Sequence, residues 1–355
     1  MDVVSIIAIT KNGIEIAKNL KAKFSGWEIF APSKFSDNDS MINWFEDSTT
    51  EKIGELFKKY QALVCIFSLG AVIRLVAPHM KDKKTDPAVV AIDDTGKFVI
   101  STLSGHLGGA NKLAEDIAGI LGATPVITTA ADVNKTIAVD MVGKEFGWRI
   151  DDDSTVTKVS AFMVNEEKIG VFQDAGERDW WAPKKELPKN VHMYTSIDEI
   201  AKSDCKGFLI ISDKIIQDRQ MLERAVVYRP KTLVVGVGLH WDTSKDIIKE
   251  GLEFCLSKFN LSAKSVAKFA SIKKEAQVAG LREIADSMQV PVDYFEKQEI
   301  AGILIPNPSD VVQAFEGTPS VSEASAIKSS GGTLIVEKQK FPPNLTIAIA
   351  RMMIK

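Results

Sequence analysis

The chain has 355 residues, of which 45% are hydrophobic and 26% are charged, and its formal net charge is −3. This composition is typical of a folded globular protein, and the length exceeds what one ordinary hydrophobic core supports. The small net charge excludes a general attraction to nucleic acid or to anionic membrane. The three cysteines form no CxxC pair, which excludes a disulfide framework and a cysteine-rich metal centre and favours a reducing, cytoplasmic location.

The first 135 residues alternate between short apolar runs and amphipathic segments. β-branched runs without helical spacing predict strands, and apolar stripes at helical spacing predict helices. We expect strands at 3–9, 27–32, 62–67 and 124–128, helices at 14–24, 50–60, 70–80 and 110–122, and two further strands around the turn Asp94–Gly96. Gly122 suits the end of the last helix. The alternation predicts an open three-layer α/β sheet.

The character of the sequence changes after residue 135. Residues 136–228 predict a small α+β unit, and residues 229–355 predict an α/β domain. In this last domain we expect a strand at 232–239, a helix at 243–259, a helix at 321–328 and two strands on either side of Pro342-Pro343. The predicted protein is therefore multi-domain α/β, with domains at 1–135, 136–228 and 229–355. No apolar run approaches the roughly 20 residues of a membrane helix, so we expect no membrane partner.

Three polar turns that carry glycine or hydroxyl side chains follow the predicted N-terminal strands. They are Ser68–Arg74, Ser101–Asn111 and Thr128–Thr136. If the strands are parallel, all three turns open at the carboxyl edge of one sheet, which is where open α/β sheets bind ligands. We therefore expect one crevice that contains Ser68–Arg74, Ser104–Asn111 and Thr128–Asp132.

His106 stands in the middle of the glycine-rich turn, before a predicted helix. Its ordinary pKa near 6.5 suits proton transfer, and the helix start offers N–H groups to an anion. The alternative is a glycine-rich helix start in which His106 only bonds its own loop. Asp132 is a candidate catalytic carboxylate or, equally, a helix N-cap.

Further residues are candidates for contact with a ligand. Arg74 offers a planar fork to a carboxylate or is a solvated helix residue, and the run 81–86 is a mobile basic flap or a solvated loop. The candidate binding residues are Gly70, Arg74, Lys83, Asp86, Ser104, Gly105, Gly108, Gly109, Asn111, Thr128 and Thr129, with Glu323 in the last domain.

Several common motifs are missing from the sequence. GVGLHW fails the dinucleotide fingerprint, because Trp241 stands at the third glycine position, and neither a P-loop nor an HExxH motif occurs. We therefore expect no nucleotide and no protein-bound metal. A phosphate or nucleotide binder that uses the helix start of LSGHLGGAN is a minor alternative.

The sequence resembles the cobalt-precorrin-5A hydrolase (CbiG) family of anaerobic cobalamin biosynthesis. The resemblance rests on SLGAVIRLVAP, DKKTDPAVVAIDDTGKFVISTLSGHLGGANKLAEDIA and LGATPVITTAAD, and in the last third on GTPSVSEASAIKSSGG and TIAIAR. There are two departures. The family often carries Cys or Ala where Ser322 stands. The family's last domain usually opens with a glycine pair followed by Cys-Arg-Arg-Gly, where this chain has Leu239-His240-Trp241-Asp242.

The resemblance implies an activity and a ligand. Family members open a δ-lactone on a cobalt-bearing macrocycle edged with acetate and propionate groups, and they release acetaldehyde. His106 would then be the base, the N–H groups of Gly108 and Gly109 oxyanion or carboxylate donors, and Arg74 and Lys83 carboxylate clamps. No cofactor of the protein's own is expected, because the substrate carries the cobalt and its ring accepts electrons.

The partners that the resemblance implies are the corrinoid substrate and neighbouring enzymes of the pathway. The sequence does not indicate an oligomeric state. The changed turn at 239–242 motivates an alternative function, a non-catalytic protein that binds a corrinoid or hands it over.

Overall fold

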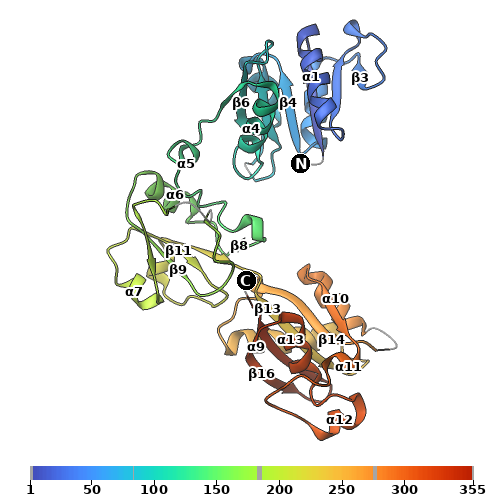
Figure 1. The fold of residues 1–355 in the computed structure, drawn as a ribbon, viewed down its shortest axis with the longest axis vertical. Helices are drawn as coiled ribbons and strands as arrows, with labels where there is room; N and C mark the ends of the chain where they lie inside the picture. Colours follow the sequence, from blue (N-terminus) through green and yellow to red (C-terminus); the bar gives the residue numbers. More distant parts are fainter. Residues whose placement is uncertain (1–2, 83, 182–185, 275–277, 354–355) are drawn as a thin grey trace. The chain divides into compact units, whose positions relative to one another are not determined.

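The computed structural model describes residues 3–82, 84–181, 186–274 and 278–353 (Figure 1). The chain divides into two compact units, Met1–Met141 and Val142–Lys355, and the second unit contains two sheets. The multi-domain α/β class predicted from the sequence is confirmed by three multi-stranded sheets with interleaved helices. The division into three domains, with boundaries at 135 and 228, stays a prediction. Among the described residues, no helix combines the length and the apolar character needed to cross a membrane.

The N-terminal unit is built on a seven-stranded sheet in the order β3-β2-β1-β4-β5-β6-β7. Its strands are β1 (Val4–Ala8), β2 (Glu28–Pro32), β3 (Ile42–Phe45), β4 (Ala62–Ile66), β5 (Ala88–Ile92), β6 (Phe98–Leu103) and β7 (Thr124–Val126). The strands β1 to β5 are parallel to one another. The strand β6 is antiparallel to β5, and β7 is parallel to β6. The strands β6 and β7 therefore run antiparallel to the other five strands of the sheet.

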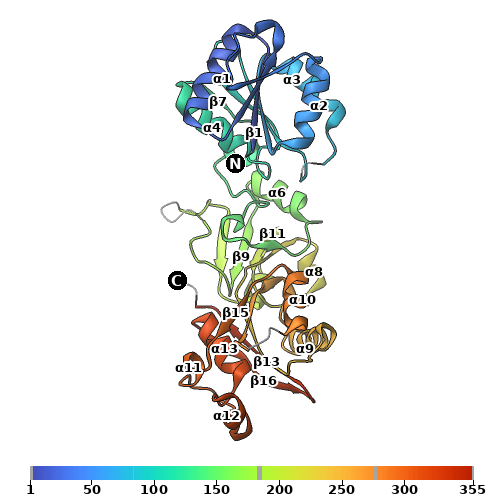
Figure 2. The same ribbon diagram turned by 90° about the vertical axis from the view of Figure 1, so that its right-hand side faces the viewer.

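Helices cover both faces of this sheet (Figure 2). They are α1 (Lys11–Lys23), α2 (Thr49–Lys59), α3 (Leu69–Val76) and α4 (Ala110–Leu121). The unit also contains the short helix α5 (Ala130–Val133) and the 3₁₀ turns η1 (Ser33–Phe35) and η2 (Ala77–His79). Because side chains alternate along a strand, Ile6 and Val64 pack toward α1 and α4, while Ile7 and Leu63 pack toward α2 and α3. The predicted three-layer arrangement is therefore confirmed.

Helix boundaries in this unit follow local side-chain chemistry. The helix α1 begins three residues earlier than predicted, because the hydroxyl of Thr10 accepts a hydrogen bond from the N–H of Gly13 and caps the first turn. The helix α2 starts with a capping box between Ser48 and Glu51. The helix α3 is shorter than predicted, because it tightens into η2 at Ala77, next to Pro78.

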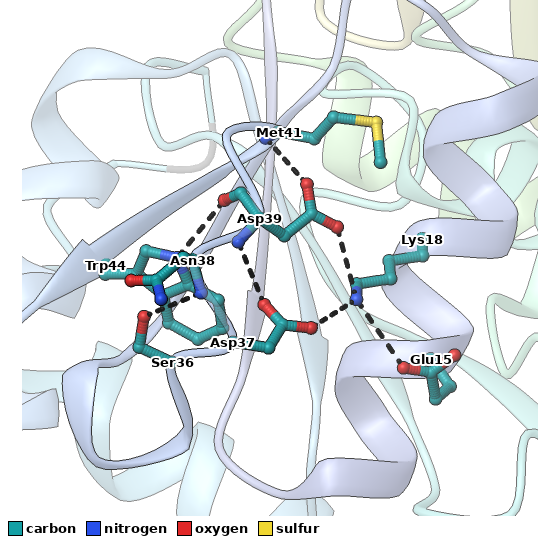
Figure 3. Close-up of polar contacts among 8 residues, drawn as sticks. All are labelled: Glu15, Lys18, Ser36, Asp37, Asn38, Asp39, Met41 and Trp44. Atoms are coloured by element: carbon teal, nitrogen blue, oxygen red, sulfur yellow. Dashed lines mark hydrogen bonds and ion pairs between the residues drawn. The ribbon is translucent and has the colours of Figure 1, made fainter.

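An ion-pair hub ties α1 to the loop before β3 (Figure 3). The ammonium of Lys18 lies 2.9 Å from Asp37, 3.2 Å from Asp39 and 3.7 Å from Glu15. The two aspartates of the loop raise the pKa of Lys18, and the backbone N–H groups of Asp39 and Met41 bond the same carboxylates. The hub therefore orders the loop through a single cation.

The middle sheet has the order β10-β9-β11-β12-β8. Its elements are β8 (Arg149–Ile150), α6 (Val156–Val164), β9 (Ile169–Gln173), β10 (Val191–Tyr194), α7 (Ile197–Ala201), β11 (Gly207–Ile211), α8 (Arg219–Leu222) and β12 (Ala225–Arg229), preceded by η3 (Lys144–Phe146). The four strands other than β8 are parallel. This alternating pattern differs from the α+β unit that we expected. The helices α7 and α8 have only five and four residues, which is too short for helical periodicity to show.

The C-terminal sheet has the order β15-β14-β13-β17-β16. Its elements are β13 (Leu233–Leu239), α9 (Lys245–Lys258), η4 (Ala263–Ser265), β14 (Val266–Ile272), α10 (Ala279–Met288), β15 (Val292–Phe295), α11 (Lys297–Ile300), α12 (Asp310–Glu316), α13 (Val321–Ser330), β16 (Thr333–Phe341) and β17 (Leu345–Arg351). The helices α9 and α10 pack on one face. The helix α13 lies against β13 so closely that a Cβ at Gly236 would be 1.9 Å from the carbonyl oxygen of Ser322.

A buried carboxylate joins the middle and C-terminal sheets within the second unit. Asp213, which follows β11, is fully buried and accepts two hydrogen bonds from Arg351 of β17, at 2.6 and 2.8 Å. The hydroxyl of Thr232 donates a third bond at 2.8 Å. A buried charge needs such partners, because its desolvation is otherwise uncompensated.

We predict that Arg351→Ala lowers the free energy of unfolding of this unit by about 3–5 kcal/mol, because it leaves the charge of Asp213 buried and unpaired. Denaturant unfolding measures the change. The exposed Arg149→Ala is the control and should cost less than about 0.5 kcal/mol. The double variant Asp213→Asn/Arg351→Met should recover part of the loss. A cost for Arg351→Ala equal to the control would contradict this account.

Candidate functional site

Two of the three predicted turns lie together, and the third lies elsewhere. The end of β6 at Leu103 pairs with Val89 at the start of β5, because the two strands are antiparallel. Val89 pairs with Leu63 at the start of β4, whereas Ser68–Arg74 follows the other end of β4. The prediction of a single crevice is therefore wrong, since it assumed that all the strands were parallel.

The structure accounts for the predicted residues that do not join the group. Gly70 and Arg74 are exposed on α3, which follows the other end of β4 and so lies at the opposite edge of the sheet from the loop that carries His106. Lys83 lies outside the described residues. Glu323 is in the C-terminal sheet, fully buried on α13. The other predicted site residues are Asp86 and residues of the loop 104–109, of the helix α4 that follows this loop and of the segment 128–132.

His106 lies between two carboxylates. Its Nε2 is 2.9 Å from Oδ2 of Asp132, and its Nδ1 is 3.4 Å from Oδ1 of Asp140. The imidazole is mostly buried, with a side-chain exposure of 17%, while that of Asp132 is 42%. The structure therefore brings together the two predicted catalytic residues and adds a third acidic group.

The two carboxylates fix the charge of His106. Asp140 and then Asp132 raise the pKa of the imidazole, in spite of the burial that lowers it. When both ring nitrogens face carboxylate oxygens, both must carry a proton to donate, so the favoured form is the imidazolium. His106 is therefore poised to give a proton before it can take one.

Asp140 was not found from the sequence. It stands eight residues after Asp132, the last residue of the turn TTAAD, in the run IAVDMVG, which matches no motif of catalytic chemistry. It meets His106 only because the chain folds back past α5. A single aspartate at this distance gives no signal in one sequence.

Asn111 connects the loop to the segment 128–132. Its Nδ2 donates to Oδ2 of Asp132 at 2.6 Å and to the hydroxyl of Thr129 at 2.9 Å, while its Oδ1 accepts from Ser101 at 2.6 Å. A Cβ at Gly105 would lie 2.6 Å from that same Oδ1, so the network leaves no room for a side chain there. Asp132 is thus held by both Asn111 and His106. Thr128 is exposed beside them.

The loop satisfies the start of α4 with its own carbonyl groups. The N–H groups of Gly109, Ala110 and Asn111 donate to the carbonyl oxygens of His106, Ser104 and Gly105, at 3.0, 3.1 and 3.0 Å. An anion would have to displace these bonds to use the helix start. The geometry therefore gives little support to Gly109 as an oxyanion donor, whereas the N–H of Gly108 forms no such bond with another described residue.

Asp86 and Ser104 hold the loop in place. The carboxylate of Asp86 accepts the N–H of Lys81 at 3.1 and 3.0 Å, and its carbonyl accepts the Ser104 hydroxyl at 3.0 Å. Ser104 itself adopts a left-handed backbone, with φ of 55°. These contacts are structural, and they fix the edge on which His106 lies.

The cluster is not arranged as a metal site. Asp132 and Asp140 contact different nitrogens of one ring, so the three groups do not converge on one point. In the part of the chain that the structure describes, no group of three His, Cys, Asp or Glu side chains does so.

We predict that His106 makes the N-terminal unit less stable as the pH rises. The pKa of His106 is raised in the folded state. Its stabilising contribution is therefore complete below the unfolded-state pKa near 6.5, and it is lost as the pH rises through the folded-state pKa. Denaturant unfolding between pH 6 and 9 should show this loss in the parent protein and much less of it in His106→Gln. The control is His192→Gln, which lies in the other unit. An equal pH dependence in parent and His106→Gln would refute the prediction.

Three family models match the chain in consecutive stretches. The model described as cobalamin synthesis G N-terminal matches residues 51–132, cobalamin biosynthesis central region matches 137–230, and cobalamin synthesis G C-terminus matches 233–350. Together they span most of the chain and include the whole loop that carries His106.

Curated relatives match almost the full length. The cobalt-precorrin-5A hydrolase of Priestia megaterium is 41% identical over 351 residues, which cover 98% of this chain and 94% of that protein. The cobalt-precorrin-5A hydrolase of Salmonella typhimurium is 29% identical, covering 94% and 93%. A crystal structure of a cobalamin biosynthesis protein G homolog from Sulfolobus solfataricus covers 99% of this chain and 98% of that chain, with 24% identity and a TM-score of 0.38.

Proposed function

The chain belongs to the CbiG family, and from this membership we propose that it is a cobalt-precorrin-5A hydrolase of cobalamin biosynthesis. The observation that carries the proposal is the 41% identity with the Priestia megaterium hydrolase over 98% of this chain. The proposed reaction opens the δ-lactone of cobalt-precorrin-5A and releases acetaldehyde to give cobalt-precorrin-5B. The proposed substrate is a corrinoid small molecule.

The reaction has two steps that need proton transfer. Water adds to the lactone carbonyl, the carbon–oxygen bond breaks, and the ring carboxylate and a free alcohol result. The alcohol then loses its proton, the carbon–carbon bond beside it breaks, and acetaldehyde leaves. The electron pair of that bond passes into the conjugated macrocycle. We propose that the chain uses no cofactor of its own, because the substrate carries the cobalt and the ring that takes these electrons.

We propose His106 as the group that serves both steps. As an imidazolium it donates a proton from Nδ1 to the leaving alkoxide, and the neutral ring then takes that proton back as the carbon–carbon bond breaks. Nδ1 is the better position, because its contact with Asp140 is 3.4 Å, against 2.9 Å between Nε2 and Asp132. The looser contact is the one that a substrate oxygen can replace.

Asp132 is the proposed acceptor for the proton of the attacking water. Its Oδ2 is held by His106 and by Asn111, and the side chain is the more exposed part of the cluster. The second proton of the water stays on the new carboxyl group. The proton held by Asp132 passes to the macrocycle that has taken up the electron pair, so the site returns to its starting charge. Asp140 acts through His106 and is a positioning residue in this scheme.

We expect His106→Ala to lower turnover by roughly 10²–10⁴-fold, the range for loss of a general acid–base group. The assay measures acetaldehyde released from the cobalt lactone, with thermal melting to confirm folding. His106→Asn should not restore the rate, and His192→Ala should leave it unchanged. A folded His106→Ala within a few-fold of the parent rate would remove His106 from the mechanism. Tight corrinoid binding by the parent with no acetaldehyde at all would instead favour a hand-over protein, the alternative suggested by the changed turn at 239–242.

The role of Asp140 gives a sharper test of the proton donor. Asp140 is the largest cause of the raised pKa of His106, so Asp140→Asn should lower that pKa. If the imidazolium is the working form, the high-pH limb of kcat/KM moves to lower pH in Asp140→Asn, while the rate at low pH changes little. If the neutral ring is the working form from the start, the low-pH limb moves instead. The pH profile of Asp116→Asn, on the exposed side of α4, serves as the control.

A further inference from the structure

A second candidate site lies in the C-terminal sheet. A cavity of about 360 Å³ opens at the carboxyl end of β13, next to the start of α13. Its lining includes Gly238 and His240 from β13 and the following turn, Ser320 before α13, and Lys338 and Lys340 of β16. The carboxyl end of a parallel strand facing a helix start is a common place for a ligand in α/β proteins.

Buried hydroxyl groups without partners are concentrated in the segment that leads into α13, of which Ser320 lines the cavity. Nine buried side-chain polar atoms among the described residues lack a hydrogen-bond partner, and four of these fall within residues 318–323. Three are hydroxyl oxygens, those of Thr318, Ser320 and Ser322, whose residues are 0–1% exposed. Burying a hydroxyl without a partner costs free energy, so such a concentration points to a ligand that supplies the missing acceptor.

The start of α13 presents further donors to the same place. Ser320 is the N-cap residue, but its hydroxyl does not cap the helix. The N–H groups of a first helical turn have no partners within the helix, and the helix dipole favours negative charge there. Ser320 and Val321 both line the cavity, so the residues at the start of α13 border the ligand position.

The charges around the cavity also suit an anion. The ammonium of Lys340 forms no hydrogen bond or ion pair with another described residue, and Lys338 donates to the carbonyl of Asn307. Of the nearby acids, Asp242 is engaged elsewhere, and Glu323, which does not line the cavity, keeps its Oε2 buried without a partner among the described residues. Oε1 of Glu323 accepts from Asn307 and from the N–H of Lys338, at 2.8 and 3.1 Å, and Asp242 pairs with His240 and Asn344.

An exposed aromatic ring adjoins the cavity. Trp241 directly follows the lining residue His240, and 72% of it is exposed. The other described tryptophans that are buried lie in cores, for example Trp27 and Trp148. A large exposed ring beside a polar cavity offers a platform for a flat ligand.

We propose that this cavity is a carboxylate-binding subsite, in which Ser320, Lys340 and the start of α13 hold an acidic side arm of a corrinoid while Trp241 contacts the macrocycle. The choice of a corrinoid rests on the proposed function. The cavity has room for an acetate or propionate arm and its hydrating water, and the macrocycle lies outside it. The subsite includes the turn at 239–242, which differs from the family pattern. An aromatic ring, that of Trp241, stands there in place of an arginine side chain.

The test measures binding to the full-length protein by calorimetry. The probes are dicyanocobyrinic acid, which has free carboxylates, and its fully methyl-esterified form. Lys340→Glu should bind the acid about 10- to 100-fold more weakly, the effect of losing a hydrogen bond to a charged group. Its affinity for the ester should be unchanged. Lys340→Met, which keeps the length of the side chain, should show a smaller loss of the same kind.

Two control variants isolate the subsite. Lys328→Glu changes the same charge at the exposed end of α13 and should have no effect on either probe. Trp241→Ala should weaken the acid and the ester alike. Thermal melting checks the fold of each variant.

Each outcome decides the proposal. If Lys340→Glu binds the acid as tightly as the parent does, the subsite is refuted. Citrate serves as a third probe, a small free anion. If Lys340→Glu loses binding of citrate but keeps binding of the corrinoid acid, the cavity takes a small free anion, and the corrinoid assignment is wrong. If Lys340 governs corrinoid binding but the parent releases no acetaldehyde, the proposed hydrolase function fails and the subsite stands.

Discussion

The reversal of the chain between β5 and β6 decides where the candidate site of the N-terminal unit lies. The turn is fixed locally, because the carboxylate of Asp93 accepts the N–H groups of Thr95 and Phe98, at 3.1 and 2.6 Å, and Gly96 takes the left-handed backbone. The strand β6 therefore ends beside the starts of β4 and β5. Its loop meets Asp86 there, and the parallel β7 delivers Thr129 and Asp132 to the same edge. The turn after β4 is left at the other edge of the sheet.

Hydrogen bonds within the loop then define what its histidine can do. The carbonyl groups of Ser104, Gly105 and His106 occupy the start of α4, and Asn111 joins Asp132 to Ser101. A loop tied in this way holds His106 between its two carboxylates without a ligand. Such preorganised charge is most effective when it needs no rearrangement during the reaction. The site therefore depends on two fixed acids around one cation, more than on an open anion hole.

The local structure of the chain was predictable, and the direction of its strands was not. Apolar runs and helical stripes identified β1, β4, α2, α4, α9 and α13 to within a few residues, and the glycine-rich loop identified His106. A β-branched run looks the same in a parallel and in an antiparallel pair, so the sequence could not reveal that Gly70 and His106 lie at opposite edges. Asp140 matched no motif, and α7 and α8 were too short to detect. The strand direction and Asp140 concern contacts that only the tertiary fold creates, whereas α7 and α8 were missed because their sequences are too short to show a period.

Buried polar groups in the second unit show how structural and ligand-binding roles can be separated. The oxygens of Asp213 are fully used by Arg351 and Thr232, so this cluster is complete without any other molecule. The hydroxyls of Ser320 and Ser322 are equally buried but have no such partners among the described residues, and Ser320 belongs to the lining of a cavity. Both clusters carry the desolvation cost of burial, and only the first recovers it inside the protein. The second recovers it when an acceptor enters the cavity, which is why the unsatisfied groups, and not the most charged ones, mark the position of a ligand.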